Sequence, residues 1–504
     1  MGFTARLCTT PQAGQLAAVS PSASTAAAPR ALPLLAGPLA FVVLRVLAPG
    51  GLDGPQATVL GVGTWMAIWW ISECLPLAVT ALLPIALFPA LGATTAAAAT
   101  APFANEVVYL YLGGFLLAEA LQRWRAHERI AFAVILRVGT ESRRLVLGVM
   151  LATAFISMWI SNTATAAMMY PIALAIGARF GHDAAARSQQ VALLLGVAFA
   201  ASIGGMATLI GTPPNLILAG AARELIGVNL DFFSFLKFGL PIAAVLLPTC
   251  WALLVFVFHR ERVSLGDDGV ASLRTQQAAL GPISSGERRV LTVFVAMAAA
   301  WFFREPKVIG ALSVVGLTDL VPGLTDAGIA VTGGIALFLV QGRANDGSPS
   351  RPLLTWREAR ELPWDVLLLF GGGLSLAAAM ESSGLATQIG QWMSGLEGLP
   401  LPLVLLGVAV VTVIVSELAS NAATASMGMP IAVALAAALG QPPLLMMLTI
   451  GLAASVGYAL PMATPPNAIV FGSGVLTVRQ MARAGLALDA IAILVVVGAL
   501  SLLF

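Results

Sequence analysis

The chain has 504 residues, of which 59% are hydrophobic and only 10% are charged, whereas an ordinary soluble domain has roughly 25% charged residues. This composition excludes a soluble protein and indicates that most of the chain lies in a membrane. The net charge of +2, without any run of basic residues interleaved with aromatic ones, argues against a nucleic-acid partner.

The first 30 residues form a segment of their own, rich in Ala, Ser, Thr and Pro. The segment carries Arg6 and Arg30 but no acidic residue, the first of which is Asp53. We predict a disordered N-terminal tail, because the whole chain shares the same bias toward alanine. The alternative is a transit peptide, which would move the protein from a bacterial inner membrane to an organellar inner membrane.

Long apolar stretches recur from residue 31 to the C-terminus. Because they are continuous and rich in Ala, Leu and Val, they indicate helices, which satisfy their own backbone groups, and not the alternating segments of a β-barrel. The prediction is an all-α polytopic membrane protein with about eleven transmembrane helices, several of them interrupted. Clear examples of these stretches are 31–48, 143–160, 189–210, 235–258, 443–460 and 484–503.

Three polar segments are rich in arginine: residues 122–144 contain six, 259–289 contain five and 341–360 contain four. Because positive charge stays on the cytoplasmic side of a membrane, all three segments are expected in the cytoplasm. Segment 259–289 is the longest polar stretch. It is predicted to be a linker loop between a first half, residues 31–258, and a second half, residues 290–504.

The two halves share three motifs in the same order, which indicates an internal repeat. The first pair of motifs is offset by 259 residues (420 − 161) and the second by 252 residues (464 − 212). The matched segments are Ser161-Asn162-Thr163 with Ser420-Asn421-Ala422, Gly211-Thr212-Pro213-Pro214-Asn215 with Ala463-Thr464-Pro465-Pro466-Asn467, and Gly113-Gly114 with Gly371-Gly372-Gly373.

The first two motifs interrupt apolar spans with residues that disfavour a helix interior. Ser, Asn and Thr favour helix caps, so each Ser-Asn motif predicts two half-helices that meet at an unwound joint. Each Thr-Pro-Pro-Asn motif breaks a helix, because prolines remove backbone donors and push the preceding residue out of helical geometry. Broken helices at equivalent places in two halves are typical of a midplane binding site in a secondary transporter. Half-helix N-termini there would face an anion, and free carbonyls would hold cations.

The glycine motifs, Gly113-Gly114 and Gly371-Gly372-Gly373, lie within apolar stretches. We predict that these stretches form two re-entrant hairpins, which enter the membrane and leave it on the same side. Close packing between helices is the alternative, because glycine lets two backbones approach each other.

A further segment, residues 70–84, reads Trp-Ile-Ser-Glu-Cys-Leu-Pro-Leu-Ala-Val-Thr-Ala-Leu-Leu-Pro. With this segment and the paired motifs, the chain resembles the divalent anion:sodium symporter family from about Trp65 to the C-terminus. This family carries dicarboxylates, citrate and, in some branches, sulfate. The resemblance implies sodium-coupled symport of C4-dicarboxylates such as succinate, malate and fumarate. It also implies an inverted repeat, a homodimer and a transport domain that moves like an elevator against a scaffold.

The resemblance implies two sodium sites and one substrate site, with no organic cofactor. The expected sodium ligands are Ser157, Ser161, Asn162 and Gly211 at the first site, and Ser416, Ala419, Asn421 and Ala463 at the second. The expected substrate residues are Asn162, Thr163, Thr212, Pro213, Asn421, Ala422, Thr464 and Pro465.

The motifs contain no Arg or Lys, so dipoles and bound cations would have to balance an anion held there. Moving one charge across 100 mV costs about 2.3 kcal/mol, so a dianion entering a negative interior alone would cost roughly 4.6 kcal/mol. Two or more sodium ions are therefore expected.

Ala422 departs from the family pattern, which usually has Thr after the second Ser-Asn. The missing hydroxyl removes a hydrogen bond of about 0.5–1.5 kcal/mol and would shift the preferred anion. Two alternatives therefore stay open: a sodium-independent dicarboxylate exchanger, and a sodium/sulfate symporter of the same fold.

Three acidic residues near the motifs have more than one interpretation. Glu417 is either a proton acceptor or a structural carboxylate that caps a broken helix. Glu73 and Glu119 either take part in transport directly or lie near an interface and bind helix ends.

Two other classes of protein are less consistent with the sequence. An intramembrane enzyme would need a catalytic set such as HExxH, which the chain lacks. A channel is less consistent because broken helices in a repeat favour alternating access over a fixed pore. Neither a disulfide framework nor a metal site is expected, because the cysteines and histidines are widely spaced, at Cys8, Cys74, Cys250, His127, His182 and His259.

Overall fold

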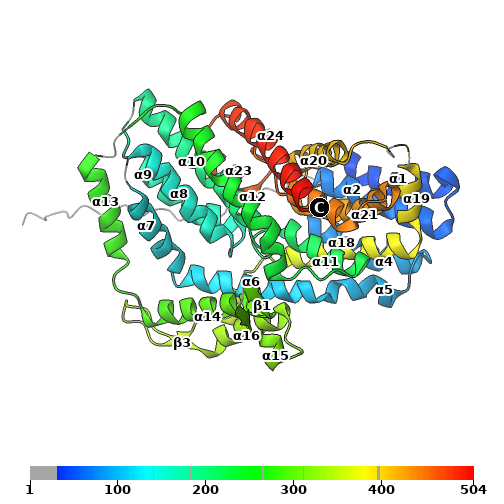
Figure 1. Ribbon diagram of the computed structural model, residues 1–504, viewed down its shortest axis with the longest axis horizontal. Helices are drawn as coiled ribbons and strands as arrows, with labels where there is room; N and C mark the ends of the chain where they lie inside the picture. The colour runs from blue at the N-terminus through cyan, green and yellow to red at the C-terminus, as the bar shows by residue number, and fades with distance from the viewer. Residues whose placement is uncertain are drawn as a thin grey trace, which may run out of the picture.

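The computed structural model describes residues 31–139, 141–181, 183–263, 266–309, 312–393, 395 and 398–504. The predicted tail at 1–30, which includes Cys8, and His182 lie outside the described residues. The described part is built almost entirely of helices, and helices from the two halves of the chain lie among one another (Figure 1).

The helices of the first half are α1 (Ala31–Leu47), η1 (Pro49–Gly51), α2 (Gly54–Ser72), α3 (Leu77–Thr80), α4 (Leu83–Ala90), α5 (Ala96–Thr100), η2 (Ala101–Ala104), α6 (Glu106–Arg123), α7 (Ala126–Val138), α8 (Ser142–Ser157), α9 (Asn162–Gly177), α10 (Ala184–Met206), α11 (Pro213–Ile226), α12 (Phe232–Ala252) and η3 (Leu253–Phe258). The remaining helices are α13 (Gly266–Ala279), α14 (Ser285–Phe302), α15 (Leu317–Leu320), α16 (Asp326–Leu339), α17 (Trp356–Ala359), α18 (Trp364–Ser382), α19 (Leu385–Trp392), α20 (Leu401–Leu418), α21 (Asn421–Leu439), α22 (Pro443–Ala453), α23 (Pro465–Phe471) and α24 (Val478–Leu503). Two short antiparallel strand pairs lie between helices, β1 (Lys307–Ile309) with β2 (Leu312–Val314), and β3 (Gln341–Gly342) with β4 (Arg351–Pro352).

Seven of the described helical stretches are long and apolar enough to cross a membrane. The structure therefore confirms a helical, multi-pass architecture, and the total of about eleven spans stays a prediction. The seven stretches are Ala96–Arg123, Ala184–Met206, Phe232–Phe258, Trp364–Ser382, Leu401–Leu418, Asn421–Leu439 and Val478–Leu503. Shorter apolar helices lie at Ala31–Leu47, Leu77–Ala90, Asp326–Leu339 and Pro443–Ala453.

Helix α10 forms the centre of the first half. Its N-terminus is capped by Asp183, whose carboxylate accepts a hydrogen bond of 2.7 Å from the backbone N–H of Ala186. Its apolar part is almost completely buried, as expected of a helix that is hydrophobic on all sides. It packs against α8, α9, α12 and α23, so residues of the second half reach the centre of the first.

The helices around the motifs have matching neighbours in the two halves. Helix α10 packs against α8, α9 and α12, and α22 packs against α20, α21 and α24. The helices that follow the Thr-Pro-Pro-Asn motifs cross between the halves, since α11 packs against α21 and α23 packs against α9. This correspondence is what an internal repeat predicts. The inverted orientation of the two halves stays a prediction.

The structure differs from the prediction at the glycine motifs. Gly113 lies inside α6, where a Cβ would overlap Ala330 of α16, and Gly372 lies inside α18, where a Cβ would overlap Ala81. A re-entrant hairpin needs a turn at its tip, and neither of these two described helices has a turn at its glycines. The alternative, close helix packing, therefore describes both motifs. Helix pairs joined at a short break occur instead at the Ser-Asn motifs, as α8 with α9 and α20 with α21.

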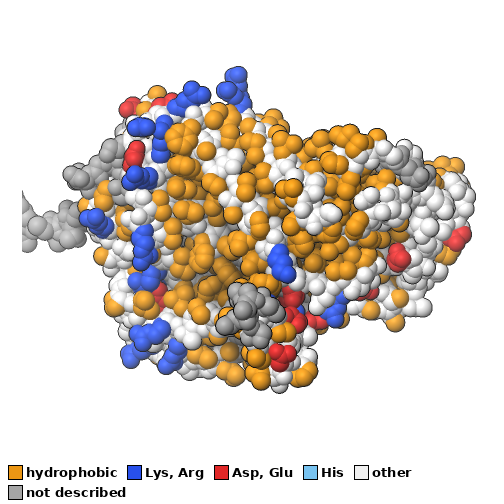
Figure 2. Space-filling view, viewed as in Figure 1, with side chains coloured by type: hydrophobic (Ala, Val, Ile, Leu, Met, Phe, Trp, Pro, Cys, Tyr) orange, Lys and Arg blue, Asp and Glu red, His pale blue; other side chains and the backbone are white. Residues whose placement is uncertain are grey.

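The three arginine-rich segments lie against one another. Arg129 of the first forms an ion pair with Glu287 of the second, and Asn345 of the third donates a 2.6 Å hydrogen bond to the carbonyl of Pro282. Figure 2 shows many Lys and Arg side chains at the end of the molecule where α7 and α13 lie, beside a largely hydrophobic surface. Segment 259–289 contains helix α13, and its role as a linker between the two halves stays a prediction.

Candidate functional site

The first Ser-Asn motif lies at a break between two helices. Helix α8 ends at Ser157 and α9 begins at Asn162, so residues 158–161 form the unwound joint that the motif predicts. Ser161 caps α9, because its Oγ accepts a 3.3 Å hydrogen bond from the backbone N–H of Ala164. The motif Ser161-Asn162-Thr163 therefore forms the N-cap and the first residues of α9.

Three oxygen atoms converge at this break. The hydroxyl of Ser157 lies 2.9 Å from Oδ1 of Asn162 and 2.6 Å from the carbonyl oxygen of Ala201 in α10. A hydroxyl has a single hydrogen, so it donates to only one of these acceptors at a time. A cluster of oxygen atoms with one hydrogen among them suits a hard cation, which prefers oxygen ligands.

The second Ser-Asn motif has the same geometry. Helix α20 ends at Leu418 and α21 begins at Asn421. The hydroxyl of Ser416 lies 2.9 Å from Oδ1 of Asn421 and 2.7 Å from the carbonyl oxygen of Ala454, at the end of α22. The two halves thus present the same arrangement of a serine, an asparagine and an alanine carbonyl.

The two Thr-Pro-Pro-Asn motifs also share one hydrogen-bond pattern. Asn215 Nδ2 donates to the carbonyls of Gly205 at 2.9 Å and Thr208 at 2.8 Å. In the second half, Asn467 Nδ2 donates in the same way to Gly457 and Leu460, at 3.1 and 3.0 Å. Each asparagine lies in the first turn of the helix after the break and holds carbonyls that precede this helix, which fixes the shape of the unwound segment.

Glycines allow the two breaks of the first half to meet. A Cβ on Gly205 would overlap the Asn162 side chain. A Cβ on Gly211 would lie 2.9 Å from the carbonyl oxygen of Ser157 and still closer to that of Gly205. Both positions therefore need glycine for a close approach of backbone segments. The second half has Ala463 where the first has Gly211, so its two breaks are less crowded.

One cavity of about 1340 Å³ brings the two halves together. Its lining includes most of the predicted residues, and the starts of α9, α11, α21 and α23 open onto it. The predicted residues that line it are Ser161, Asn162, Thr163, Gly211, Thr212, Pro213, Asn421, Ala422, Ala463, Thr464 and Pro465. The other three, Ser157, Ser416 and Ala419, are buried behind the lining.

Of the three acidic residues near the motifs, Glu417 binds backbone N–H groups, whereas Glu73 and Glu119 line the cavity. The Glu417 carboxylate accepts hydrogen bonds from the backbone N–H groups of Ala459 at 2.8 Å and Leu460 at 2.9 Å. It therefore caps the unwound segment before α23, as the structural interpretation of this residue predicts. Glu73 and Glu119 both line the cavity.

Two features of the site were not predicted from the sequence. One is the contact of each serine with a backbone carbonyl, that of Ala201 or Ala454. The other is the pair of hydrogen bonds from Asn215 and from Asn467 to carbonyls of the unwound segments. Backbone carbonyls have no side-chain signature. The repeat does carry a signal for them, because the offset between the two alanines, 253 residues (454 − 201), is close to the 252 residues between the two Thr-Pro-Pro-Asn motifs.

Known proteins are similar to the chain over nearly its whole length. A family model described as the sodium:sulfate symporter transmembrane region matches residues 30–503. The sodium-dependent dicarboxylate transporter SdcS of Staphylococcus aureus (strain USA300) is 36% identical over 473 residues, which are 92% of this chain and 89% of that transporter. The same transporter of strain NCTC 8325 / PS 47 matches with the same identity and coverage.

Two solved structures share the fold at low sequence identity. The YdaH transporter of Alcanivorax borkumensis has a TM-score of 0.53 and 13% identity, covering 89% of this chain and 98% of that one. MtrF of Neisseria gonorrhoeae has a TM-score of 0.53 and 12% identity, covering 91% of this chain and 97% of that one. The family model and the relatives together establish that this chain is a multi-pass membrane transporter and belongs to the divalent anion:sodium symporter family.

Proposed function

We propose that the protein is a secondary active transporter that couples the symport of C4-dicarboxylates, such as succinate, malate and fumarate, to sodium. The observation that carries this proposal is the cavity onto which helices of both halves open with their N-termini. The positive ends of helix dipoles favour an anion there, although the motif segments contain no Arg or Lys. The sodium-dependent dicarboxylate transporter from S. aureus supports the same substrate class.

The two oxygen clusters support two sodium sites. At the first, Ser157, Ser161, Asn162 and Gly211 would supply side-chain and carbonyl oxygens, together with the carbonyl of Ala201. A sodium ion there would complete a cluster that has one hydroxyl hydrogen for three oxygens. Its positive charge would also attract an anion in the cavity, which links sodium binding to substrate binding.

The second sodium site repeats the first with ligands from the other half. Its proposed ligands are Ser416, Ala419, Asn421 and Ala463, with the carbonyl of Ala454. Two such cations would neutralise a dianion, whose uncompensated entry across 100 mV would cost roughly 4.6 kcal/mol. The number of ions could exceed two, since electroneutrality sets only the lower bound.

The substrate would bind where the helix N-termini converge. The residues proposed to contact it all line the cavity, namely Asn162, Thr163, Thr212, Pro213, Asn421, Ala422, Thr464 and Pro465. The cavity exceeds the roughly 300–1,000 Å³ of an ordinary ligand pocket, so the rest of it would serve as the path to the site.

The path would lead to the cytoplasm in the state described here. The cavity lining also includes Gln122 and Arg123, which belong to an arginine-rich segment placed in the cytoplasm by the positive-inside rule. A homodimer, an elevator-type exchange of access and a bacterial inner-membrane location complete the proposal, and all three rest on the family resemblance.

A sodium/sulfate symporter is the alternative that a specific observation favours. Ala422 presents a methyl group to the cavity where a threonine hydroxyl would hold a second carboxylate, and the matching family model is described by sulfate. Exchange without sodium is a further alternative of the same fold, although both serine–asparagine pairs are present here.

Uptake by proteoliposomes tests these alternatives together. Radiolabelled succinate is supplied outside purified, reconstituted protein with an inward sodium gradient, and a potassium gradient serves as the control. The proposal expects sodium-dependent uptake that unlabelled malate and fumarate inhibit and that Asn162→Ala abolishes. Uptake that needs internal dicarboxylate but not sodium would establish the exchanger, and sodium-dependent uptake of sulfate alone would establish the sulfate symporter.

A further inference from the structure

The cavity is lined by charged side chains in addition to the two motif sets. The charged side chains of its lining are Glu73, Glu119, Arg123, Glu361 and Asp365. Arg123 is therefore the only basic residue among the described lining residues. An anion in this cavity therefore meets four carboxylates and one guanidinium group, and of these charged groups only Arg123 attracts it.

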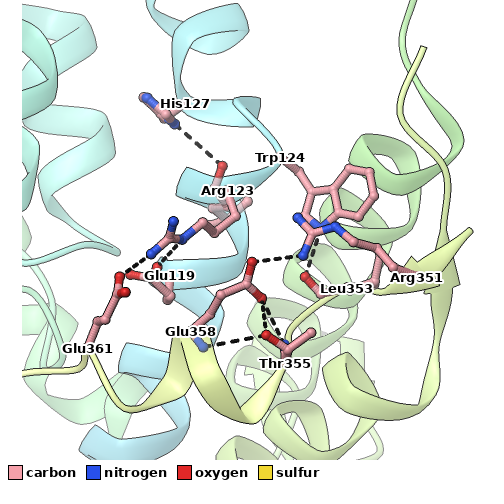
Figure 3. A network of polar contacts seen from close by, with 10 residues as sticks. Glu119, Arg123, Trp124, His127, Arg351, Leu353, Thr355, Glu358 and Glu361 are labelled. Carbon is pink, nitrogen blue, oxygen red and sulfur yellow. Dashed lines mark hydrogen bonds and ion pairs between the residues drawn. The ribbon is translucent and has the colours of Figure 1, made fainter. Parts of the chain in front are cut away.

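Arg123 forms ion pairs with two carboxylates that differ in solvent exposure. Its Nε lies 2.6 Å from Oε1 of Glu119, whose side chain is only 14% exposed. Its Nη2 forms an ion pair with Glu361, whose side chain is 62% exposed. Nη1 has no hydrogen-bond partner in the part of the chain that is described. Figure 3 shows the dashed contacts from Arg123 to Glu119 and to Glu361, and the cluster of Glu358 and Thr355 lies apart from them.

The segment that carries Glu361 is fixed without this ion pair. The indole N–H of Trp124 donates a 2.7 Å hydrogen bond to the carbonyl of Leu353. Further along, Glu358 accepts 2.8 Å contacts from both Arg351 and the Thr355 hydroxyl (Figure 3). Burial alone would raise the pKa of the Glu358 carboxyl, but the hydrogen bonds from Thr355 and the contact with Arg351 outweigh it and lower this pKa. Removing the charge of Glu361 therefore leaves its segment in place.

The two contacts of Arg123 would allow one of its carboxylate partners to be exchanged while the other stays bound. Glu119, one helical turn before Arg123 and largely buried, holds Nε of the guanidinium, and both residues line the cavity. Glu361 is mostly in solvent, and exposed ion pairs of this kind contribute little stability, so another carboxylate can replace it at small cost. A guanidinium also binds carboxylates through two parallel hydrogen bonds, which an ammonium group does not match.

We propose that Arg123 forms a docking subsite at the mouth of the cavity, where one carboxylate of the dianion replaces Glu361 before it reaches the helix N-termini. This inference rests on the proposed function and names a new residue that speeds substrate capture. Glu361 acts as a competitor for the same guanidinium. Arg123→Gln should therefore slow substrate capture, whereas Glu361→Gln should speed it. If the ion pair had only a structural role, both substitutions would break the same contact and would change capture in the same direction.

Membrane vesicles of both orientations provide the test. Everted vesicles from expressing bacteria present the cytoplasmic mouth to added succinate, and right-side-out vesicles present the opposite side. At saturating sodium, Arg123→Gln is expected to raise KM in everted vesicles about two- to fivefold, the size of one exposed ion pair. Glu361→Gln is expected to lower it, and kcat and the sodium dependence stay unchanged. Added choline chloride shrinks both differences, because salt screens the attraction.

The controls separate this inference from the proposed function. Arg144→Gln removes an arginine of the same polar segment whose side chain is 68% exposed and lies outside the cavity lining, and it is expected to leave KM unchanged. An effect confined to one side of the membrane, with opposite signs for the two variants, supports the docking subsite. Effects of the same sign, effects equal on both sides, or no effect overturn it. Absence of sodium-driven succinate uptake in the unaltered protein overturns the proposed function as well.

Discussion

The hydroxyl of Ser416 lies 2.9 Å from Oδ1 of Asn421, across the break between two helices. Ser157 and Asn162 have the same 2.9 Å separation in the first half. In each pair the serine also contacts a backbone carbonyl of a third helix, so three segments of chain meet at one hydroxyl. Because the two arrangements match, equivalent substitutions in the two halves should have comparable effects on sodium binding.

Removal of the Ser416 hydroxyl should weaken sodium binding. In Ser416→Ala we expect the sodium concentration for half-maximal uptake to rise about tenfold, since a contact to a charged group is worth about 1.5 kcal/mol. Sodium titration of succinate uptake measures this change. Thr412→Val is the matched control on the same helix, because the Thr412 hydroxyl donates a 2.7 Å hydrogen bond to the carbonyl of Val408 within its own helix. Equal sodium dependence of Ser416→Ala and the control would refute a ligand role for Ser416.

A methyl group at Gly211 should disturb the first sodium site. Gly211→Ala places a Cβ 2.9 Å from the carbonyl oxygen of Ser157, so the backbone around the break has to move. We expect weaker sodium binding and a lower unfolding temperature in detergent. The reciprocal change, Ala463→Gly, should be mild, because it removes a methyl group without crowding.

A control for Gly211→Ala is available on an apolar helix. A Cβ on Gly407 meets nothing within 4 Å, so Gly407→Ala should leave sodium binding unchanged and raise the unfolding temperature slightly, because alanine favours a helix. A Gly211→Ala variant that binds sodium as the unaltered protein does would show that the close approach at Gly211 has no role in the site.

Restoring a hydroxyl at Ala422 should change the preferred anion. In Ala422→Thr a hydroxyl faces the cavity beside the start of α21. One added hydrogen bond of about 0.5–1.5 kcal/mol corresponds to a roughly two- to tenfold gain in succinate affinity. Competition between succinate and sulfate measures the shift, and Ala422→Ser tests whether the hydroxyl alone suffices. A loss of succinate affinity in both variants would contradict this role.

Arg304, which is not among the residues that line the cavity, should be important for the stability of the fold. It forms ion pairs with Asp231 at 2.7 Å and Asp326 at 2.8 Å, and all three side chains are at most 12% exposed. Arg304→Ala would leave two buried carboxylates without their cation, which typically costs about 3–5 kcal/mol. We expect a markedly lower unfolding temperature in detergent, whereas the exposed Arg144→Ala should have no effect. Similar unfolding temperatures for both variants would contradict the assignment.

Local chemistry explains why the sequence located the breaks in the helices. Asn162 and Asn421 begin helices because their motifs favour caps, and Pro213 and Pro465 begin helices because proline has no N–H to lose there. These preferences act over a few residues, so a repeated motif reveals them. The cavity onto which all four helices open follows from the repeat, since equivalent breaks in two packed halves meet at the interface between them.

Tertiary contacts explain what the sequence did not reveal. Gly113 was predicted to lie in a hairpin, but it allows the approach of Ala330, more than 200 positions away in the chain. The ion pair between Arg123 and Glu361 likewise joins positions 238 residues apart. No local preference distinguishes a glycine at a turn from one at a helix contact, nor an arginine at a cavity mouth from one in a loop.

Binding of radiolabelled succinate to the purified protein in detergent tests the central claim most directly, because it needs neither a gradient nor a defined orientation. The measurement compares sodium chloride with potassium chloride at equal ionic strength. We predict saturable binding in sodium, little binding in potassium, and loss of the sodium-dependent binding in Asn162→Ala. Equal binding of succinate in the two salts would contradict the claim that sodium at the paired serine–asparagine sites holds the anion.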